Sequence, residues 1–193
     1  MKEQLLDLLS ARRGHFRLES GHHGNLWLDL DSLFLRPVRW MPFARELARR
    51  LSAHRIEAVV GPLVGGAFVA QTVATELDLH FAFAERLADA QGVTYRIPDS
   101  LRDSLRGKTV AIVDDAINAG SATRATYAVL KSLGARPVVV GALLILGETA
   151  LPFFEANNVA VESIARLPNE LWEVAACPLC AAGVPLSIPP GAG

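Results

Sequence analysis

This chain has no large excess of charge of either sign, no long apolar run and few cysteines. Lysine and arginine total 19 against 20 aspartates and glutamates, so no basic excess favours a nucleic-acid partner. No apolar run reaches the length of a membrane span, and the N-terminal MKEQLLDLLSARRG lacks the apolar core of a signal peptide. We therefore expect a cytoplasmic protein with neither a membrane nor a nucleic-acid partner.

The rest of the composition is that of a globular domain. Hydrophobic residues make up 51% of the chain and charged residues 20%, which argues against disorder. A length of 193 residues leaves room for a substantial core, and no repeat or low-complexity segment stands out. We expect residues 1–193 to form a single domain.

The two cysteines, Cys177 and Cys180, form one C-x-x-C pair near the end of the chain. One pair supplies half of a zinc site, and no histidine lies near it in the sequence. Structural packing is the favoured interpretation, with redox or metal roles as alternatives. His22 and His23 fall in a predicted turn, where solvated side chains are favoured over contacts to a base or a phosphate.

The most informative segment is VAIVDDAINAGSATRAT, residues 110–126. Val110–Val113 is a short β-branched run typical of a buried strand, and Asp114 and Asp115 follow it at once. A loop of small residues, 116–122, then leads into a predicted helix at Ala122–Leu133. Such a loop suits an anion, because unpaired N–H groups and the helix dipole meet there. A solvated acidic turn with tight packing is the alternative that these features alone leave open.

A second glycine loop lies earlier in the chain. Residues 61–66 read GPLVGG, between a predicted strand at Ala58–Gly61 and a predicted helix at Ala67–Leu77. Adjacent glycines let backbone N–H groups approach a diphosphate, although a simple tight turn has the same composition. Neither loop has the spacing of a dinucleotide-binding or P-loop motif.

Four segments carry a family resemblance. VAIVDDAINAGSATR resembles the phosphoribosyl pyrophosphate (PRPP) motif of type I phosphoribosyltransferases, and is most similar to the V-D-D-V-I-T-A-G-T-A of orotate phosphoribosyltransferases. GPLVGG resembles the pyrophosphate loop of that family, and FRLESGHHGNLWLDLD its N-terminal F-x-L-x-S-G-x-x-S-x-x-Y-x-D segment. CPLCAAGVPL resembles the C-terminal C-P-L-C-x-x-G-x-P-L of many orotate enzymes. The resemblance spans nearly the whole chain.

The resemblance implies an enzyme that uses PRPP and Mg²⁺ to convert a free base, orotate above all, into a nucleotide in pyrimidine biosynthesis. It implies catalytic roles for Asp114 and Asp115, which would hold ribose hydroxyls directly or through PRPP-bound Mg²⁺, and for Arg86. It also implies a homodimer in which the loop of one chain covers the site of the other. The implied PRPP-binding residues are Ala116, Ile117, Asn118, Ala119, Gly120, Ser121, Ala122, Val64, Gly65 and Gly66.

The alternation of predicted strands and helices, together with the resemblance, implies an α/β fold like that of the type I phosphoribosyltransferases. It would have a parallel core sheet flanked by helices and a small N-terminal hood at about residues 14–36. Further helices are predicted at 2–12, Pro37–Ala53 and Thr149–Asn157, further strands at His80–Ala84, Val138–Leu146 and Val159–Ala165, and a hairpin at Phe16–Leu30. Residues 85–107 are predicted to be an irregular, mobile loop, and the final IPPGAG to be frayed.

The sequence departs from the orotate enzymes where they place cations. Glu19 stands at their usual K-S-G lysine, and no lysine lies between Met41 and Lys108, although their loop reads R-K-x-x-K-x-H-G. Gly147 stands at about the place of an arginine that faces orotate. Arginines 96, 102 and 106 either replace this charge or are solvated. Two alternatives follow: a PRPP- or nucleotide-binding regulator with little or no activity, and a transferase for another base.

Overall fold

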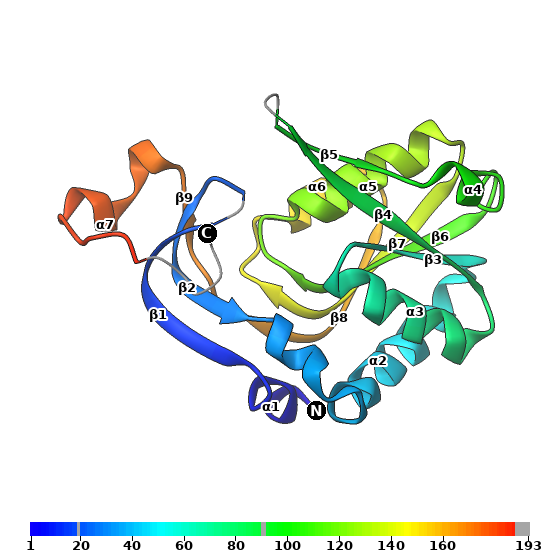
Figure 1. Ribbon diagram of the computed structural model, residues 1–193, viewed down its shortest axis with the longest axis horizontal. Helices are drawn as coiled ribbons and strands as arrows, with labels where there is room; N and C mark the ends of the chain where they lie inside the picture. Colours follow the sequence, from blue (N-terminus) through cyan, green and yellow to red (C-terminus); the bar gives the residue numbers. More distant parts are fainter. Residues whose placement is uncertain (19, 90–91, 188–193) are drawn as a thin grey trace.

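The computed structural model describes residues 1–18, 20–89 and 92–187, and its centre is a six-stranded sheet (Figure 1). The strands lie in the order β5-β4-β3-β6-β7-β8. Their bounds are β3 (Ala58–Pro62), β4 (His80–Asp89), β5 (Gly92–Arg96), β6 (Thr109–Ile117), β7 (Arg136–Leu146) and β8 (Ala160–Leu167). All neighbours pair in parallel except β4 and β5, so the predicted α/β class with a parallel core sheet is confirmed.

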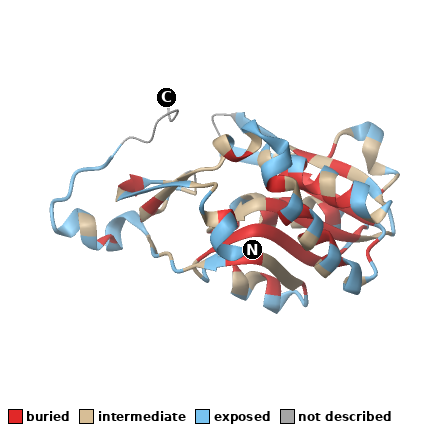
Figure 2. Ribbon diagram, turned by 90° about the horizontal axis from the view of Figure 1, so that it is seen from below, coloured by how far each residue is buried: buried red, intermediate tan, exposed pale blue. Residues whose placement is uncertain are grey.

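Helices cover both faces of this sheet. One face packs against α2 (Pro37–Leu51) and α3 (Gly65–Leu77), and the other against α5 (Ser121–Ser132) and α6 (Leu151–Ala156). Val59 faces the first pair of helices and Val60 the second, and both are fully buried. Because water is excluded from both faces, β3 is buried along its whole length, and Figure 2 shows buried strands in the core sheet.

A second sheet of three strands forms the hood. It contains β1 (Ser10–Arg17), β2 (His23–Asp29) and β9 (Leu171–Trp172), with β2 pairing antiparallel to both others. The hairpin was predicted, but the helix predicted over 2–12 was too long: α1 covers only Lys2–Leu6. Residues 10–13 instead pair with 26–29 of β2, and this long-range pairing overrides the local helical pattern.

The region 85–107 is more regular than predicted. β4 continues to Asp89 and β5 returns beside it, with Glu85 opposite Arg96 in the register. The short helix α4 (Asp99–Arg102) follows. The prediction of irregular structure was therefore wrong for most of this segment, since cross-strand pairing organises its polar residues. Glu19 and the IPPGAG segment at 188–193 lie outside the described residues.

The remaining elements are short. In the described residues they are three 3₁₀ turns, η1 (Asp31–Leu35), η2 (Ser52–His54) and η3 (Val174–Ala176), and the helix α7 (Pro178–Ala181). Within the described part of the chain, no helix combines the length and the apolar character needed to cross a bilayer.

Candidate functional site

The two acids lie near the carboxyl end of β6, in the middle of the core sheet. Asp114 is 7% exposed, and its Oδ1 accepts the backbone N–H of Asp115 at 3.0 Å. Asp115 Oδ1 in turn accepts the backbone N–H of Ala116 at 2.7 Å. Ligands of such sheets bind beyond the carboxyl ends of the strands, so the pair occupies the position where a substrate is expected.

Burial raises the pKa of both the Asp114 and the Asp115 carboxyl and so disfavours their ionisation. Desolvation, followed by the charge of Asp115, raises the pKa of Asp114 well above its usual 3.8. Desolvation also raises the pKa of Asp115, against the opposing effect of its hydrogen bonds to Asp114 and Ala116. A cation, or several hydroxyl donors, brought to this pair would favour its ionised form.

The start of α3 presses against the acids. A β-carbon added at Gly66 would lie 2.5 Å from Asp114 Oδ1, and one at Gly65 would overlap Asp115 Oδ2. Only glycine allows this approach at either position. The structure thus brings the two loops that were predicted to bind PRPP into contact, while Val64, the residue before α3, is 62% exposed beside them.

The loop after β6 is shorter than predicted. Ala116 and Ile117 still belong to the strand, where they pair with Leu144 and Ile145 of β7. The predicted start of the loop at Ala116 was therefore wrong, because the small side chain of Ala116 does not interrupt the strand pairing. The turn consists of residues 118–120, and α5 begins at Ser121.

The turn delivers the N-terminus of α5 to the same edge of the sheet. Gly120 has φ of +77°, a conformation that favours glycine, and a β-carbon there would lie 2.8 Å from that of Ala150. Thr123 Oγ1 donates to the carbonyl of Gly120 at 3.1 Å. The first backbone N–H groups of α5, from Ser121 onwards, have no acceptor within the helix and can bind an anion.

Arg86 lies on β4, close to the GPLVGG loop. Two residues before it, Ala84 pairs with Pro62 and its carbonyl accepts the N–H of Leu63 at 2.9 Å. The exposed Arg86 has no hydrogen-bond or ion-pair partner among the residues that the structure describes. The other candidate cations form ion pairs with neighbouring acids: Arg96 with Glu85 at 2.8 Å, Arg102 with Asp99 at 3.0 Å and Arg106 with Asp103 at 3.7 Å.

Gly147 cannot carry a side chain in this structure. Its φ is +64°, and an added β-carbon would lie 2.5 Å from the carbonyl oxygen of Asn169. Asn169 Nδ2 donates to Asn118 Oδ1 at 3.0 Å, so the segment before β9 reaches the turn after β6. Asn169 Oδ1 is buried without a partner in the described part of the chain. A lone loop asparagine carries no sequence pattern, and the sequence analysis missed it.

A second group of polar residues lies in the hood, where the sequence analysis was wrong about His23 and did not detect the histidines that lie near the cysteines in space. His23 is 3% exposed rather than solvated, because it lies on β2 and not in the turn. His15 and His23 lie beside Cys177 and Cys180, although no histidine is near those cysteines in the sequence. His22 is the residue at the turn, and it contacts Ser20 at 3.2 Å and Glu173 at 3.1 Å.

Comparison with known proteins agrees with this geometry. The model of the phosphoribosyl transferase domain matches residues 41–167, which include the GPLVGG loop, both acids and α5. An orotate phosphoribosyltransferase from Caldanaerobacter subterraneus subsp. tengcongensis is 30% identical over an alignment of 192 positions, which covers 97% of this chain and 96% of that protein.

Solved structures share the fold. An orotate phosphoribosyltransferase from Aeropyrum pernix aligns with a TM-score of 0.64 and 24% identity over 81% of this chain and 88% of that one. An adenine phosphoribosyltransferase from Thermoanaerobacter pseudethanolicus aligns with a TM-score of 0.67 and 16% identity over 86% of this chain and 99% of that one. Enzymes for different bases thus have this fold, and the fold does not select the base.

Proposed function

We propose that this chain, which belongs to the phosphoribosyltransferase family and within it to the orotate phosphoribosyltransferases, transfers the phosphoribosyl group of PRPP to orotate. The products are orotidine 5′-monophosphate, a precursor in pyrimidine biosynthesis, and pyrophosphate. The observation that carries the proposal is the contact of Gly65 and Gly66 with Asp115 and Asp114, beside the N-terminus of α5. This arrangement offers one place for a diphosphate, a ribose and a phosphate.

The reaction breaks the bond between ribose C1 and pyrophosphate and forms a bond from C1 to a ring nitrogen of orotate. Positive charge develops on the ribose as the first bond stretches. Asp114 and Asp115 accept hydrogen bonds from the ribose hydroxyls and stabilise that charge. The N–H groups at residues 118–122 hold the 5′-phosphate, and those at residues 64–66 the pyrophosphate.

The two acids also fit a role for magnesium. They present carboxylate oxygens only, which is the donor type that Mg²⁺ prefers, and they are adjacent at one strand. We propose that Asp114 and Asp115 would hold the Mg²⁺ that arrives bound to PRPP. When bound, Mg²⁺ neutralises charge on the leaving pyrophosphate.

We further propose that residues 1–193 act as one domain and that the hairpin of β4 and β5 is the mobile cover of a site. Arg86 on this hairpin is the cation available for pyrophosphate, because its guanidinium is not engaged by another described residue. A homodimer would let the hairpin of one chain cover the site of the other. Exposed apolar side chains support such an interface: Leu35 is 80%, Val38 78% and Phe68 44% exposed.

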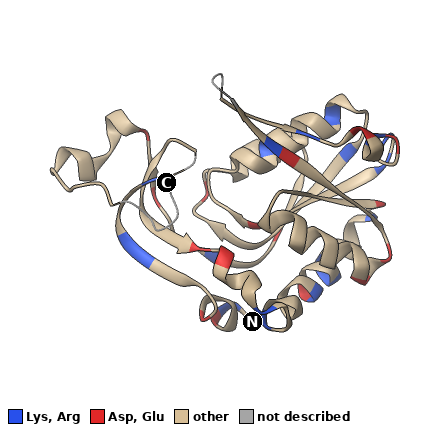
Figure 3. Ribbon diagram, in the orientation of Figure 1, with Lys and Arg blue, Asp and Glu red and all other residues tan. Residues whose placement is uncertain are grey.

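We propose a cytoplasmic enzyme without a nucleic-acid partner. The net charge of −1 supports this, because binding to nucleic acid is dominated by basic surface. Basic and acidic residues also lie side by side on β4 in Figure 3.

A second candidate is a PRPP-binding protein with little orotate activity, or a transferase for a less anionic base. It is favoured by the ion pairs that engage Arg96, Arg102 and Arg106, and by the close contact that keeps a side chain from Gly147. An anionic base beside a pyrophosphate needs cations or aimed N–H donors.

Steady-state kinetics with PRPP, Mg²⁺ and a panel of free bases separates the two. Under the first proposal orotate is consumed and pyrophosphate appears in equal amount. If another base reacts and orotate does not, the assignment of orotate is wrong. If PRPP binds but no base reacts, the regulator is supported.

The site itself is tested by calorimetry on Asp114→Asn/Asp115→Asn. We expect PRPP to bind at least about tenfold more weakly, which corresponds to about 1.4 kcal/mol. Arg106→Ala is the control, because Arg106 forms an ion pair with Asp103 and not with Asp114 or Asp115. Unchanged affinity in the double variant would contradict the assignment of the acids.

A further inference from the structure

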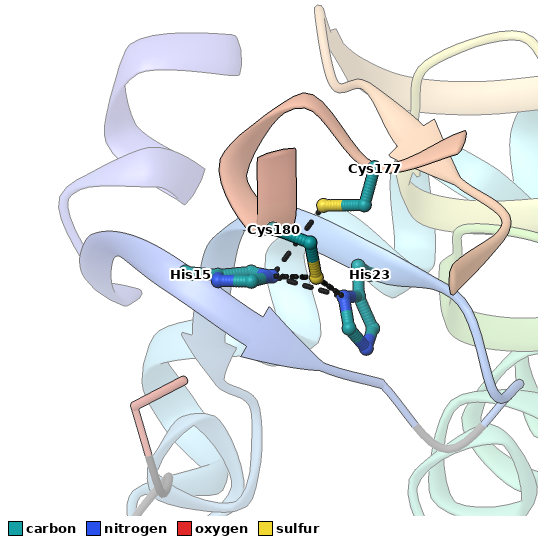
Figure 4. Close-up of side chains that lie close together, drawn as sticks. All are labelled: His15, His23, Cys177 and Cys180. Carbon is teal, nitrogen blue, oxygen red and sulfur yellow. Dashed lines mark hydrogen bonds between the residues drawn. The ribbon is translucent and has the colours of Figure 1, made fainter. Parts of the chain in front are cut away.

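Four potential metal ligands meet in the hood, on elements that the transfer reaction does not use. His15 comes from β1, His23 from the start of β2, Cys177 from the residue before α7 and Cys180 from within α7 (Figure 4). The ligand atoms of all four lie within 4.8 Å of one another. His15 and Cys177 are 162 residues apart in the chain, so tertiary folding alone brings them together.

The separations match a tetrahedral zinc site. His15 Nε2 lies 2.9 Å from His23 Nδ1, 3.4 Å from Cys177 Sγ and 3.7 Å from Cys180 Sγ, and Cys180 Sγ lies 3.3 Å from His23 Nδ1. Zinc bonds of about 2.0–2.1 Å to nitrogen and about 2.3 Å to sulfur place ligand atoms about 3.3–3.8 Å apart in a tetrahedron. Of these four separations only His15–His23 falls outside this range, and the remaining ligand-atom pairs lie within 4.8 Å, so modest side-chain shifts would bring all four atoms around one ion.

The backbone prepares His15 for this role. The β1–β2 register shifts between Arg13 and Phe16, so His15 lies in a bulge, and His15 and Phe16 are both buried in succession. A regular strand would turn alternate side chains to opposite faces, and a bulge is a common way to re-aim one of them. His15 is 1% exposed as a result.

The tautomer of His15 is also set. Its Nδ1 lies 2.8 Å from the carbonyl oxygen of Val184, which can only accept, so Nδ1 carries the proton. In the neutral ring Nε2 then presents a lone pair toward His23 and the two sulfurs. Histidines that bind metals usually donate their other N–H to such a carbonyl or carboxylate.

The segment that carries the cysteines has little else to hold it. Val174, Val184 and Leu186 are 53%, 40% and 48% exposed, so apolar burial contributes little there. Among the described residues, and besides the contacts of the cysteines themselves, two hydrogen bonds attach it to the hairpin, from Ser187 N to His15 O at 2.6 Å and from His15 Nδ1 to Val184 O at 2.8 Å, together with the two-residue strand β9. Both cysteines are free thiols, so no disulfide replaces the missing core.

We propose that His15, His23, Cys177 and Cys180 bind one Zn²⁺ ion that fastens residues 174–187 to the β1–β2 hairpin. Two thiols and two imidazoles favour zinc over Mg²⁺ or Ca²⁺, which prefer oxygen. On binding, each thiol releases one proton to water as its Zn–S bond forms, and the resulting centre is neutral. All four positions belong to protein, so the site is closed and structural. The proposal is independent of the transferase activity.

The test uses the full-length protein purified with a thiol reductant and without added chelator. Elemental analysis is expected to find about one zinc per chain. After removal of the metal, titration with Zn²⁺ alone should restore it, and Co²⁺ should give the strong visible absorption of a tetrahedral thiolate site. Cys177 and Cys180 should resist alkylation in the zinc-loaded protein and react after chelation.

Variants assign the site. Cys177→Ser/Cys180→Ser should lose at least about nine-tenths of the zinc, whereas His22→Ala, one residue from a ligand, should keep all of it. Asp114→Asn should also keep it, which excludes binding at the acids. The wild-type measurements decide the matter even if the cysteine variant fails to fold. Folded wild-type protein that takes up no zinc, freely reactive thiols in its presence, or zinc retained by the double serine variant would each overturn the proposal.

Discussion

The two sheets of this molecule are stabilised in different ways. In the core sheet β3 is buried along its whole length, and eight consecutive residues at the end of β7 are buried. In the hood sheet the first four residues of β1 are exposed and both residues of β9 are only half buried. The buried centre of the hood includes two histidines and a cysteine, whereas that of the core is mainly apolar, with Asp114, Thr123 and Thr126 as its buried polar side chains.

The difference separates two ways of using polar groups. The core excludes water by packing, and this lets it hold Asp114 and Asp115 in a state that disfavours charge until a ligand arrives. The hood lacks enough apolar surface for that, and its stability depends on directional contacts among His15, His23 and the cysteines. Damage to the core should therefore unfold the molecule, while damage to the hood should be local.

The largest test of this contrast is a cavity in the core. Phe154 is fully buried and packs edge-on against Phe153, so Phe154→Ala should lower the free energy of unfolding by about 3–5 kcal/mol. Leu171→Ala, in half-buried β9, should cost about 1 kcal/mol or less. Urea unfolding measures both. Equal losses at the two positions would remove the distinction between the sheets.

Two glycines allow activity and stability to be separated within the core. Gly65→Ala places a methyl group on Asp115 Oδ2, so the Asp115 carboxyl must move, and kcat/KM should fall about 100-fold, or about 2.7 kcal/mol. Gly141→Ala instead meets the methyl groups of Leu51 and Leu47 at 3.2–3.3 Å, and should cost about 1 kcal/mol of stability through overpacking. Its activity should survive. If Gly65→Ala were fully active, Gly65 would not be packed against a catalytic acid.

The core sheet was largely predictable from the sequence because its central strands are buried by packing on both faces. Runs such as Val110–Val113 are apolar because both faces of the strand are covered, and the period of α5 matched its observed bounds within one residue. Ala116 was misplaced because a small residue after two acids fits a strand or a loop equally well, and the β-branched Ile117, which favours a strand, was grouped with the loop around it. Only the pairing with β7 decides between them.

The hood was much less predictable. His15 and Cys180 are 165 residues apart, and no local pattern links them. Asn169, which donates a hydrogen bond to Asn118, also lacks a local sequence pattern that would predict this contact. The β4–β5 hairpin at the edge of the core sheet was missed for a related reason, because its polar residues are organised by cross-strand pairs such as Glu85–Arg96. Elements held by long-range polar contacts leave little trace in hydrophobic periodicity.

Two arginines of the hairpin should differ although both are largely exposed. Arg86→Ala should lower kcat about tenfold, because it removes the cation proposed to stabilise the leaving pyrophosphate. Arg96→Ala removes only the exposed pair with Glu85, and should change stability by less than about 1 kcal/mol and leave kcat intact. Pre-steady-state and steady-state rates with PRPP and Mg²⁺ measure this. Equal effects of the two substitutions would mean that Arg86 is an ordinary surface charge.

The smallest expected effect is on the thermal stability of the ligand-free protein, and it arises from the energetic penalty of ionising the buried Asp114. Because the folded-state pKa of Asp114 is raised above 3.8, the native state binds more protons than the unfolded state between those two values. Stability of the wild-type protein therefore falls as pH rises through this range, and the penalty is complete above the folded pKa. Asp114→Asn removes the penalty, so at neutral pH it should raise the melting temperature of ligand-free protein by about 2–4 °C. The gain should shrink as pH falls and vanish below about 3.8, where the wild-type carboxyl is neutral in both states.

Thermal melts of both proteins across pH, without PRPP or Mg²⁺, measure the difference. A gain that does not depend on pH would show that the substituted amide packs better for another reason, and lower stability of the variant at neutral pH would mean that the core holds the charged acid without cost.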